Sequence, residues 1–254
     1  MSSATSPIVV IVPGAFGTPA GFDEIIPHLN GLQTHSGAYP SCNPPDPMNA
    51  TCSGDTEALR SILLSLLDQQ RDVVILAHSF GGVVGGCAAK DLDRDTRKAQ
   101  GHTSAVIGLL YVAGNVTLDG ESLFEAVGSA YPPFIKQHKP SKGLCLIEPA
   151  MEILFNDCKP DPELEKSVLP HALRAFETKA SAPAWRDKGF DGRRTYIRTA
   201  NDNCNPLPQQ DAWIKKSGVK WNIVNFETGH MPFVSQPEAL GAEIVKFVDE
   251  VMKL

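Results

Sequence analysis

Long hydrophobic runs are missing from this chain of 254 residues. The apolar run nearest its start spans only positions 8 to 12, far short of the roughly 18 residues that cross a bilayer. The first seven residues also lack Lys and Arg, so the basic region of a secretory signal peptide is absent. These absences predict a cytoplasmic protein with no membrane partner.

A surplus of positive charge is missing too. The 23 Lys and Arg residues are outnumbered by 29 Asp and Glu residues, which leaves a formal net charge of -6 at pH 7. No run of Lys or Arg exceeds two residues, whereas nucleic acids and anionic membranes are bound by basic patches. The sequence therefore excludes a nucleic-acid partner and favours a small-molecule substrate, bound by a monomer or a homodimer.

Motifs for metals and nucleotides are absent as well. The six cysteines form no C-x-x-C pair and have no zinc-ligand spacing. Neither G-x-G-x-x-G nor a P-loop sequence can be written over the glycines that follow the first apolar run. We therefore expect no metal and no cofactor. The thiols are expected to be reduced, although a disulfide between Cys42 and Cys52 is left open.

The chain does contain a regular alternation of two patterns. Short apolar runs typical of strands buried on both faces occur at 8–12, 73–77, 105–112, 195–199 and 220–225. Helical patterns occur at 19–29, 55–70, 79–92, 207–217 and 237–252. Alternating strands and helices need crossover connections, so we predict an α/β fold with a mostly parallel sheet and helices on both faces.

The segment 117–185 interrupts this alternation. It contains several prolines and helical patches at 121–127 and 162–177, but no convincing strand. It is therefore predicted to be an inserted helical cap on a core made of 1–116 and 186–254.

The strongest functional motif follows the second apolar run, where the sequence reads Ala77-His78-Ser79-Phe80-Gly81. A helix rich in small residues comes next. A nucleophilic serine on a tight strand-to-helix turn needs small residues two positions away on either side, because larger side chains would collide within the turn. Ala77 and Gly81 meet that need, so Ser79 is the predicted nucleophile.

Two backbone N–H groups are predicted to form an oxyanion hole beside this serine. One is the N–H of Phe80, at the start of the following helix. The other comes from the glycine-containing turn at 13–17, because ligands of open parallel sheets bind at the carboxyl ends of strands. Within this turn Ala15 is favoured as the donor, and Phe16 is the alternative.

A general base and an acid complete the predicted set. His230 lies in a turn after the last apolar run and before the C-terminal helix, which is the place of the base in the chain order Ser, acid, His. Asp202 follows the run at 195–199 and is the predicted acid, with Asp211 in the next helix as the alternative. His78 is interpreted as a structural neighbour of the nucleophile.

Together these motifs resemble the α/β-hydrolase superfamily, and most closely its small methylesterases, hydroxynitrile lyases and carboxylesterase-like members. The resemblance covers essentially the whole chain and extends to the segment 154–158 and to the run that follows His230. It implies a six-stranded sheet with a helical cap. Hydroxynitrile lyases of this type carry a lysine directly after the catalytic histidine; Met231 stands there in this chain, so cyanohydrin cleavage is not expected.

The expected activity is therefore that of a serine hydrolase, which cleaves a small carboxylic ester, thioester or lactone through an acyl-enzyme. Two alternatives use the same fold: a cofactor-free lyase or cyclase, and a small-molecule receptor. The apolar residues expected to line the substrate pocket are Phe124, Tyr131, Phe134, Leu144, Ile147, Met151, Leu154, Phe155, Trp185 and Met231.

Overall fold

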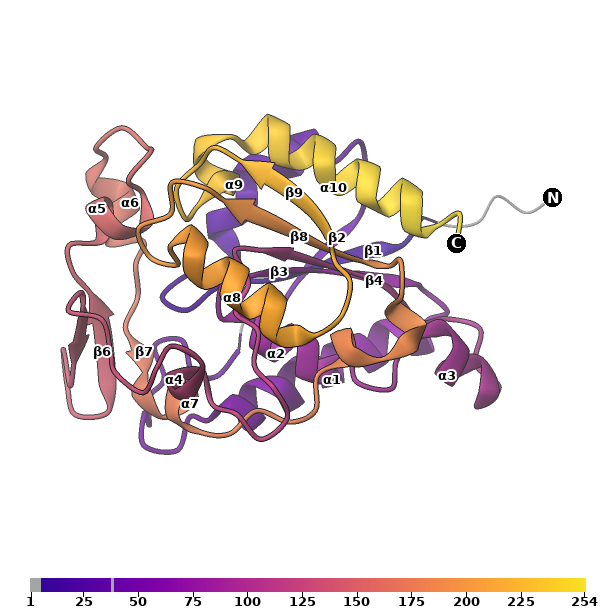
Figure 1. Cartoon of the computed structure of the whole chain (residues 1–254), viewed down its shortest axis with the longest axis horizontal. Helices are drawn as coiled ribbons and strands as arrows, with labels where there is room; N and C mark the ends of the chain where they lie inside the picture. The colour runs from indigo at the N-terminus through magenta and orange to yellow at the C-terminus, as the bar shows by residue number, and fades with distance from the viewer. Residues whose placement is uncertain (1–5, 38) are drawn as a thin grey trace.

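The computed structural model describes residues 6–37 and 39–254. Its centre is a parallel six-stranded sheet with the strand order β2-β1-β3-β4-β8-β9. The strands are β1 (Ile8–Val12), β2 (Thr34–Ser36), β3 (Val73–His78), β4 (Val106–Val112), β8 (Arg194–Thr199) and β9 (Asn222–Phe226). Their carboxyl ends point toward the same end of the molecule (Figure 1). The predicted α/β class and parallel sheet are confirmed.

Burial distinguishes the central strands from the edges. Every residue of β1, β3 and β4 is buried, as expected of apolar runs that are covered on both faces. β9 is instead an edge strand with exposed and half-exposed residues, so the prediction of a doubly buried strand at 220–225 is wrong. The other edge strand, β2, has three residues and no apolar run to reveal it.

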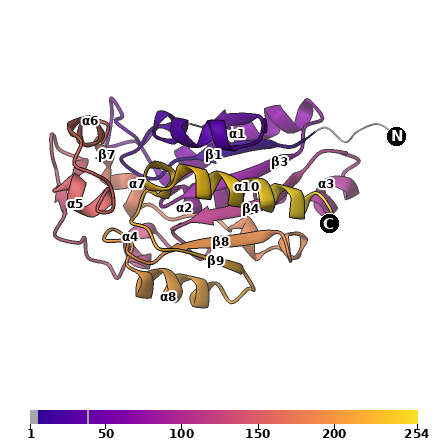
Figure 2. The same ribbon diagram turned by 90° about the horizontal axis from the view of Figure 1, so that it is seen from above.

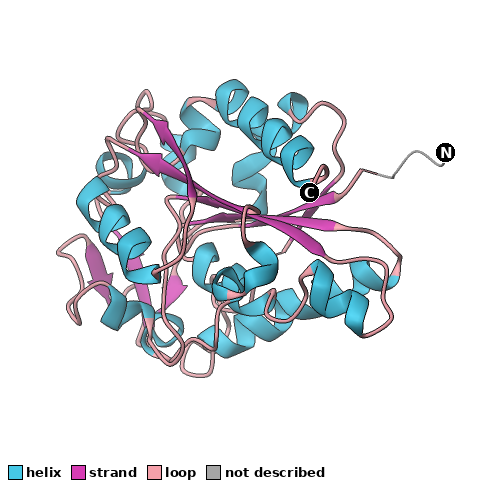
Figure 3. Cartoon of the chain, turned by 45° about the vertical axis from the view of Figure 1, so that its right-hand side comes forward, coloured by secondary structure: helices cyan, strands magenta, loops and turns pink. Residues whose placement is uncertain are grey.

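Helices cover both faces of the sheet, which is visible between the helical layers in Figure 3. On one face η1 (Pro19–His28) packs against α9 (Pro232–Ser235) and α10 (Pro237–Val251). On the other face α1 (Cys52–Asp68) packs against α2 (Gly81–Ala88). The remaining helices of this part are α3 (Arg94–Ala99), η2 (Ala184–Arg186), η3 (Lys188–Phe190) and α8 (Leu207–Ser217).

The inserted segment contains strands as well as helices. Its helices are α4 (Leu123–Ala126), α5 (Ala150–Leu154), α6 (Pro162–Lys166) and α7 (Leu173–Glu177). Its strands β5 (Ile135–Gln137), β6 (Leu144–Ile147) and β7 (His171–Ala172) form an antiparallel sheet. The prediction that this segment has no strand is therefore wrong, because strands of two to four residues are too short to show an alternating pattern. The boundaries at 117 and 185 stay a prediction.

The cap lies at the end of the sheet toward which the strands point (Figure 2). Hydrogen bonds join it to the turn after β1 and to the loop before α1. The N–H of Leu169 donates to the carbonyl of Phe16 at 2.8 Å, and the N–H of Ala172 donates to the carbonyl of Ser41 at 3.0 Å. The cap therefore covers the carboxyl edge of the sheet, where the predicted functional residues lie.

The cysteines form no disulfide. All six are free, so Cys42 and Cys52 do not pair. Burial, with a smaller effect of the nearby Asp55 carboxylate, raises the pKa of the Cys42 thiol to about 11. Within 6–37 and 39–254, none of the helices has both the length and the apolar character needed to cross a membrane.

Candidate active site

Ser79 lies on a sharp turn between β3 and α2. Its backbone φ is 50°, a left-handed conformation that is strained for a residue with a side chain and that presents the hydroxyl above the sheet. The turn closes because Gly81 has no side chain: a Cβ there would collide with the carbonyl oxygens of Val12 and Pro13. The small residue at position 81 therefore permits the tight strand-to-helix turn that the sequence predicts.

Asp202 and His230 form a buried hydrogen-bonded pair. Oδ2 of Asp202 lies 2.8 Å from Nδ1 of His230 and accepts a second hydrogen bond from the Thr199 hydroxyl at 2.8 Å. Its Oδ1 accepts the N–H groups of Cys204 and Asn205, each at 2.8 Å. Asp202 therefore caps its own turn and also orients His230, and these contacts hold the carboxylate in one position.

The alternative acid lies elsewhere. Asp211 is exposed on α8 and forms an ion pair with Arg198 at 2.6 Å. It makes no hydrogen bond with His230, whose Nδ1 is occupied by Asp202. The structure therefore brings His230 together with Asp202, which was the favoured candidate for the acid.

Gln210 supports the loop that carries Asp202, and no sequence signal marks it. The side chain is fully buried on α8. Its Nε2 lies 3.0 Å from the carbonyl and 2.9 Å from the hydroxyl of Thr199, and 2.7 Å from the carbonyl of Asn205. Because the Thr199 hydroxyl in turn donates to Asp202, Gln210 on α8 helps to hold the Asp202 carboxylate in position.

His78 fixes the backbone of His230. Its Nε2 lies 2.9 Å from the carbonyl oxygen of His230, and its ring packs against Phe22 and Phe233. Burial, aided by the nearby His230 imidazole, lowers the pKa of His78 well below its usual value. The ring is therefore neutral, and its Nε2–H donates to that carbonyl. His78 is a structural neighbour, as interpreted, with a defined positioning contact.

Opposing effects act on the pKa of His230. Burial lowers it, whereas the Asp202 carboxylate raises it by its charge and hydrogen bond, with a further contribution from Cys204. The net direction is upward, well above the usual value of 6.5. The sequence does not determine whether the pKa of His230 is raised or lowered. The contact with Asp202 decides the direction.

The predicted oxyanion donors lie around the nucleophile. A Cβ added to Gly14 would lie 2.9 Å from Cβ of Ser79, so the turn after β1 passes directly beside the serine. The N–H groups of Ala15, Phe16 and Phe80 donate no hydrogen bond to a described residue. All three therefore stay candidate donors to an incoming oxygen, and the alternative between Ala15 and Phe16 stays open.

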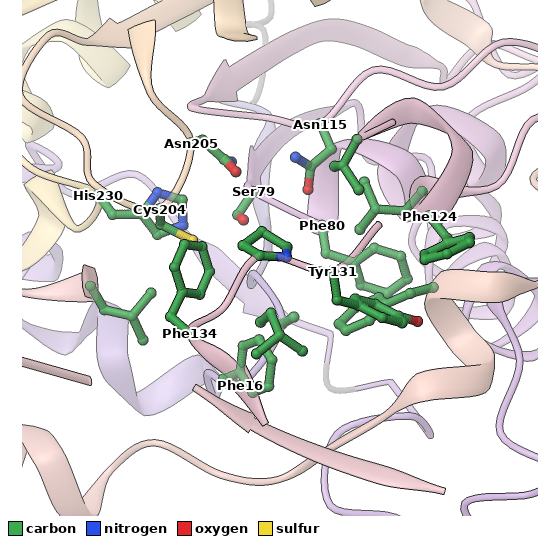
Figure 4. A pocket seen from close by; sticks show the side chains of 17 residues that line it. Phe16, Ser79, Phe80, Asn115, Phe124, Tyr131, Phe134, Cys204, Asn205 and His230 are labelled. Atoms are coloured by element: carbon green, nitrogen blue, oxygen red, sulfur yellow. The ribbon is translucent and has the colours of Figure 1, made fainter. Parts of the chain in front are cut away.

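Ser79 and His230 border one mostly apolar cavity beneath the cap (Figure 4). It has about 630 Å³ of space free of protein atoms, part of it open to solvent. Of the predicted pocket residues, those that line this cavity are Phe124, Tyr131, Phe134 and Leu154.

The other predicted pocket residues lie outside this cavity. Phe155 and Met231 line a second cavity that shares Ala15 and Phe16 with the first, so their place in the substrate pocket stays a prediction. Leu154, which precedes Phe155 in the chain, borders both cavities. Neither cavity is lined by Leu144, Ile147, Met151 or Trp185.

Sequence reasoning missed half of the cavity wall. The cap contributes Leu123, Val127, Pro132, Ile135 and Phe176, and loops of the core contribute the polar residues Asn115, Cys204 and Asn205. The position of Asn115 three residues after the end of an apolar run was the one available signal, because loops at the carboxyl ends of strands carry ligand contacts in such sheets.

A second set of Ser, His and Asp lies behind Phe16 but is not a catalytic arrangement. The Asp55 carboxylate accepts hydrogen bonds from the N–H and the hydroxyl of Ser41, at 2.9 and 2.5 Å. Oγ of Ser41 lies 3.0 Å from Nε2 of His171. The serine thus separates acid from histidine, and all three are fully buried away from both cavities. No described group of three or more His, Cys, Asp or Glu side chains has a metal-binding arrangement.

Asp55 gives a testable dependence of stability on pH. Burial raises its pKa from 3.8 to about 6, against the lowering effect of the Ser41 hydrogen bonds. A folded-state pKa above the unfolded value stabilises the fold at low pH, and this contribution is lost as the pH rises from about 4 to about 6. As the pH rises over that range, wild type loses this contribution and Asp55→Asn does not. We therefore expect the free energy of unfolding of Asp55→Asn, minus that of wild type, to increase by up to about 3 kcal/mol. Urea unfolding at several pH values measures the difference, and a constant difference would contradict the prediction.

The chain belongs to the alpha/beta hydrolase family, whose sequence model matches residues 9–243. In sequence it is similar to the alpha/beta hydrolase nvfD of Aspergillus novofumigatus, with 26% identity over 255 residues that cover 98% of this chain and 99% of that protein. The predicted superfamily is confirmed, and the chain is a hydrolase by family.

Solved structures of other proteins share its fold. A pyrethroid hydrolase from Sphingobium faniae has a TM-score of 0.77 at 19% identity, with 98% of this chain and 100% of that chain covered. Polyneuridine aldehyde esterase has a TM-score of 0.71 at 18% identity, with 95% and 99% covered. At these identities the likeness establishes the fold, and the chemistry has to be argued from the site.

Proposed function

We propose that the chain is a serine esterase that cleaves small carboxylic esters through an acyl-enzyme. One observation carries the proposal: Ser79, on its strained turn, borders the same apolar cavity as the His230–Asp202 pair, beside N–H groups without partners. Thioesters and lactones offer the same reacting carbonyl and fall within the proposed class.

In the proposed reaction, neutral His230 takes the proton of the Ser79 hydroxyl while the serine oxygen attacks the carbonyl carbon. The N–H groups of Phe80 and of Ala15 or Phe16 stabilise the resulting oxyanion. The imidazolium, stabilised by Asp202, then donates its proton to the departing alcohol. Water repeats the sequence: His230 takes a proton from it, the hydroxide attacks the acyl-enzyme, the carboxylic acid leaves, and Ser79 regains its hydrogen.

A substrate panel combined with covalent labelling tests this proposal. We expect turnover of p-nitrophenyl esters, compared across increasing acyl length and alongside a lactone, a thioester and an aryl methyl ester. A fluorophosphonate should add once per chain, on the peptide that contains Ser79. Ligand binding without turnover would favour the receptor alternative. Catalysis that survives both the label and Ser79→Ala would favour the lyase or cyclase.

The dependence of kcat/KM on pH follows from the pKa of His230. Only the neutral imidazole accepts the serine proton, so activity should fall as the pH drops through that pKa. Because Asp202 raises the pKa above 6.5, the midpoint of the acid limb is expected above that value for a neutral ester. Initial rates between about pH 5 and about pH 9 locate it. A midpoint below 6.5 would mean that burial outweighs the carboxylate.

A further inference from the structure

Asn115 places a buried amide inside the cavity. It follows β4, and its backbone N–H donates to the carbonyl of Ser79 at 2.9 Å, which sets it beside the nucleophile. Only 3% of Asn115 is exposed, and its side chain lines the cavity. The side-chain amide makes no hydrogen bond with any residue of the described chain. Figure 4 shows it directed into the cavity next to Ser79.

Two other polar side chains of this wall already have a partner. Nδ2 of Asn205 donates to the carbonyl of Ala113 at 3.0 Å, and the Tyr131 hydroxyl donates to Glu177 at 3.1 Å. The cap residues Leu123, Phe124 and Val127 line the same cavity with apolar side chains, which have no hydrogen-bonding group to offer the amide. The amide of Asn115 is open to the cavity and not sealed inside the protein, so a polar group of a bound ligand can reach it.

The position of Asn115 indicates which part of a substrate it meets. The leaving oxygen has to lie next to His230, from which it receives its proton. In Figure 4 His230 and Asn115 lie on opposite sides of Ser79. An acyl group that extends away from the leaving oxygen would then extend toward Asn115. A side-chain amide offers one acceptor oxygen and two N–H donors, which match a hydroxyl or a carbonyl oxygen.

We propose that Asn115 binds an oxygen function on the acyl chain close to the reacting carbonyl, so that the preferred substrates are esters of hydroxy or oxo acids. The inference rests on the proposed esterase function and adds the substrate class. The aromatic side chains of Phe80 and Phe124 lie on the Asn115 side of the cavity (Figure 4) and are proposed to pack against the rest of the acyl group. An apolar pocket discriminates weakly between acyl chains, whereas one hydrogen bond to a buried polar group discriminates strongly.

Matched esters and a matched control test the proposal. Phenyl butanoate is compared with phenyl 3-hydroxybutanoate and phenyl 3-oxobutanoate, which differ only in the added oxygen. We expect the wild type to prefer at least one oxygenated ester, and Asn115→Leu to reduce that ratio of kcat/KM by about 10-fold to 100-fold. Asn222→Leu, on the exposed edge strand β9, should leave the ratio unchanged. The two oxygenated esters show whether a hydroxyl or a carbonyl is bound.

Two further measurements separate this role from a structural one and from the esterase proposal. Asn115→Leu removes an unpartnered amide at nearly constant shape, so its Tm should not fall; a clear fall would assign Asn115 a structural role and overturn the proposal. In Ser79→Ala, calorimetry should show tighter binding of the oxygenated ester, and the added Asn115→Leu should abolish the difference. If the wild type hydrolyses none of the esters, the esterase proposal fails and this binding comparison still decides the role of Asn115. An unchanged preference in both assays overturns it.

Discussion

Ser79→Ala is expected to lower kcat/KM for simple esters by a factor on the order of 10³ or more. The substitution removes the oxygen that forms the acyl-enzyme, so only the oxyanion N–H groups and the cavity remain to accelerate hydrolysis. Steady-state rates on p-nitrophenyl acetate measure the loss. The fold should be retained, because Ser79 makes no side-chain hydrogen bond that supports β3 or α2.

Ser65→Ala is the matched control for this variant, because Ser65 is exposed on α1 and far from the cavity in the fold. It should keep the wild-type rate and the fluorophosphonate adduct. Retention of more than about a tenth of the activity in Ser79→Ala would rule out the covalent serine mechanism.

Asp202→Asn is expected to lower kcat by a factor of about 10³ to 10⁴ near neutral pH. The amide has no charge with which to stabilise the imidazolium, and its NH₂ group cannot accept the Nδ1–H of His230. It also disturbs the hydrogen bonds with Thr199 and with the N–H groups of Cys204 and Asn205. Because Asp202 raises the pKa of His230, the acid limb of any residual activity should move to lower pH.

Asp211→Asn is the matched control, since Asp211 was the alternative acid and pairs with Arg198 on the surface. Its rate should stay within about twofold of wild type, because exposed ion pairs contribute little. If Asp211→Asn proved the damaging substitution and Asp202→Asn remained active, the hydrogen bonds of Asp202 would serve only to cap its turn.

The sequence predicted the centre of the site because its requirements are local. A buried apolar run followed by Ser79, with Gly81 two residues later, permits few conformations other than a tight strand-to-helix turn. The short apolar runs at 8–12, 73–77 and 105–112 likewise predicted the central strands, since a parallel sheet covered on both faces needs continuous apolar residues. The order of Ser79, Asp202 and His230 along the chain followed from the same sheet topology.

Other features depend on contacts between segments that are distant in the chain, and only the tertiary structure decided them. Cys145 pairs with His171 in the cap sheet, 26 residues away, and strands this short have no pattern of their own. Leu154 borders both cavities and its neighbour Phe155 only the second, a difference that the sequence positions do not reveal. Asn115 belongs to no sequence motif. It is of interest because its side chain lies in the cavity beside Ser79 and has no hydrogen-bond partner in the described chain. The pKa of His230 is raised because the effect of Asp202 outweighs that of burial, and both effects exist only in the folded molecule.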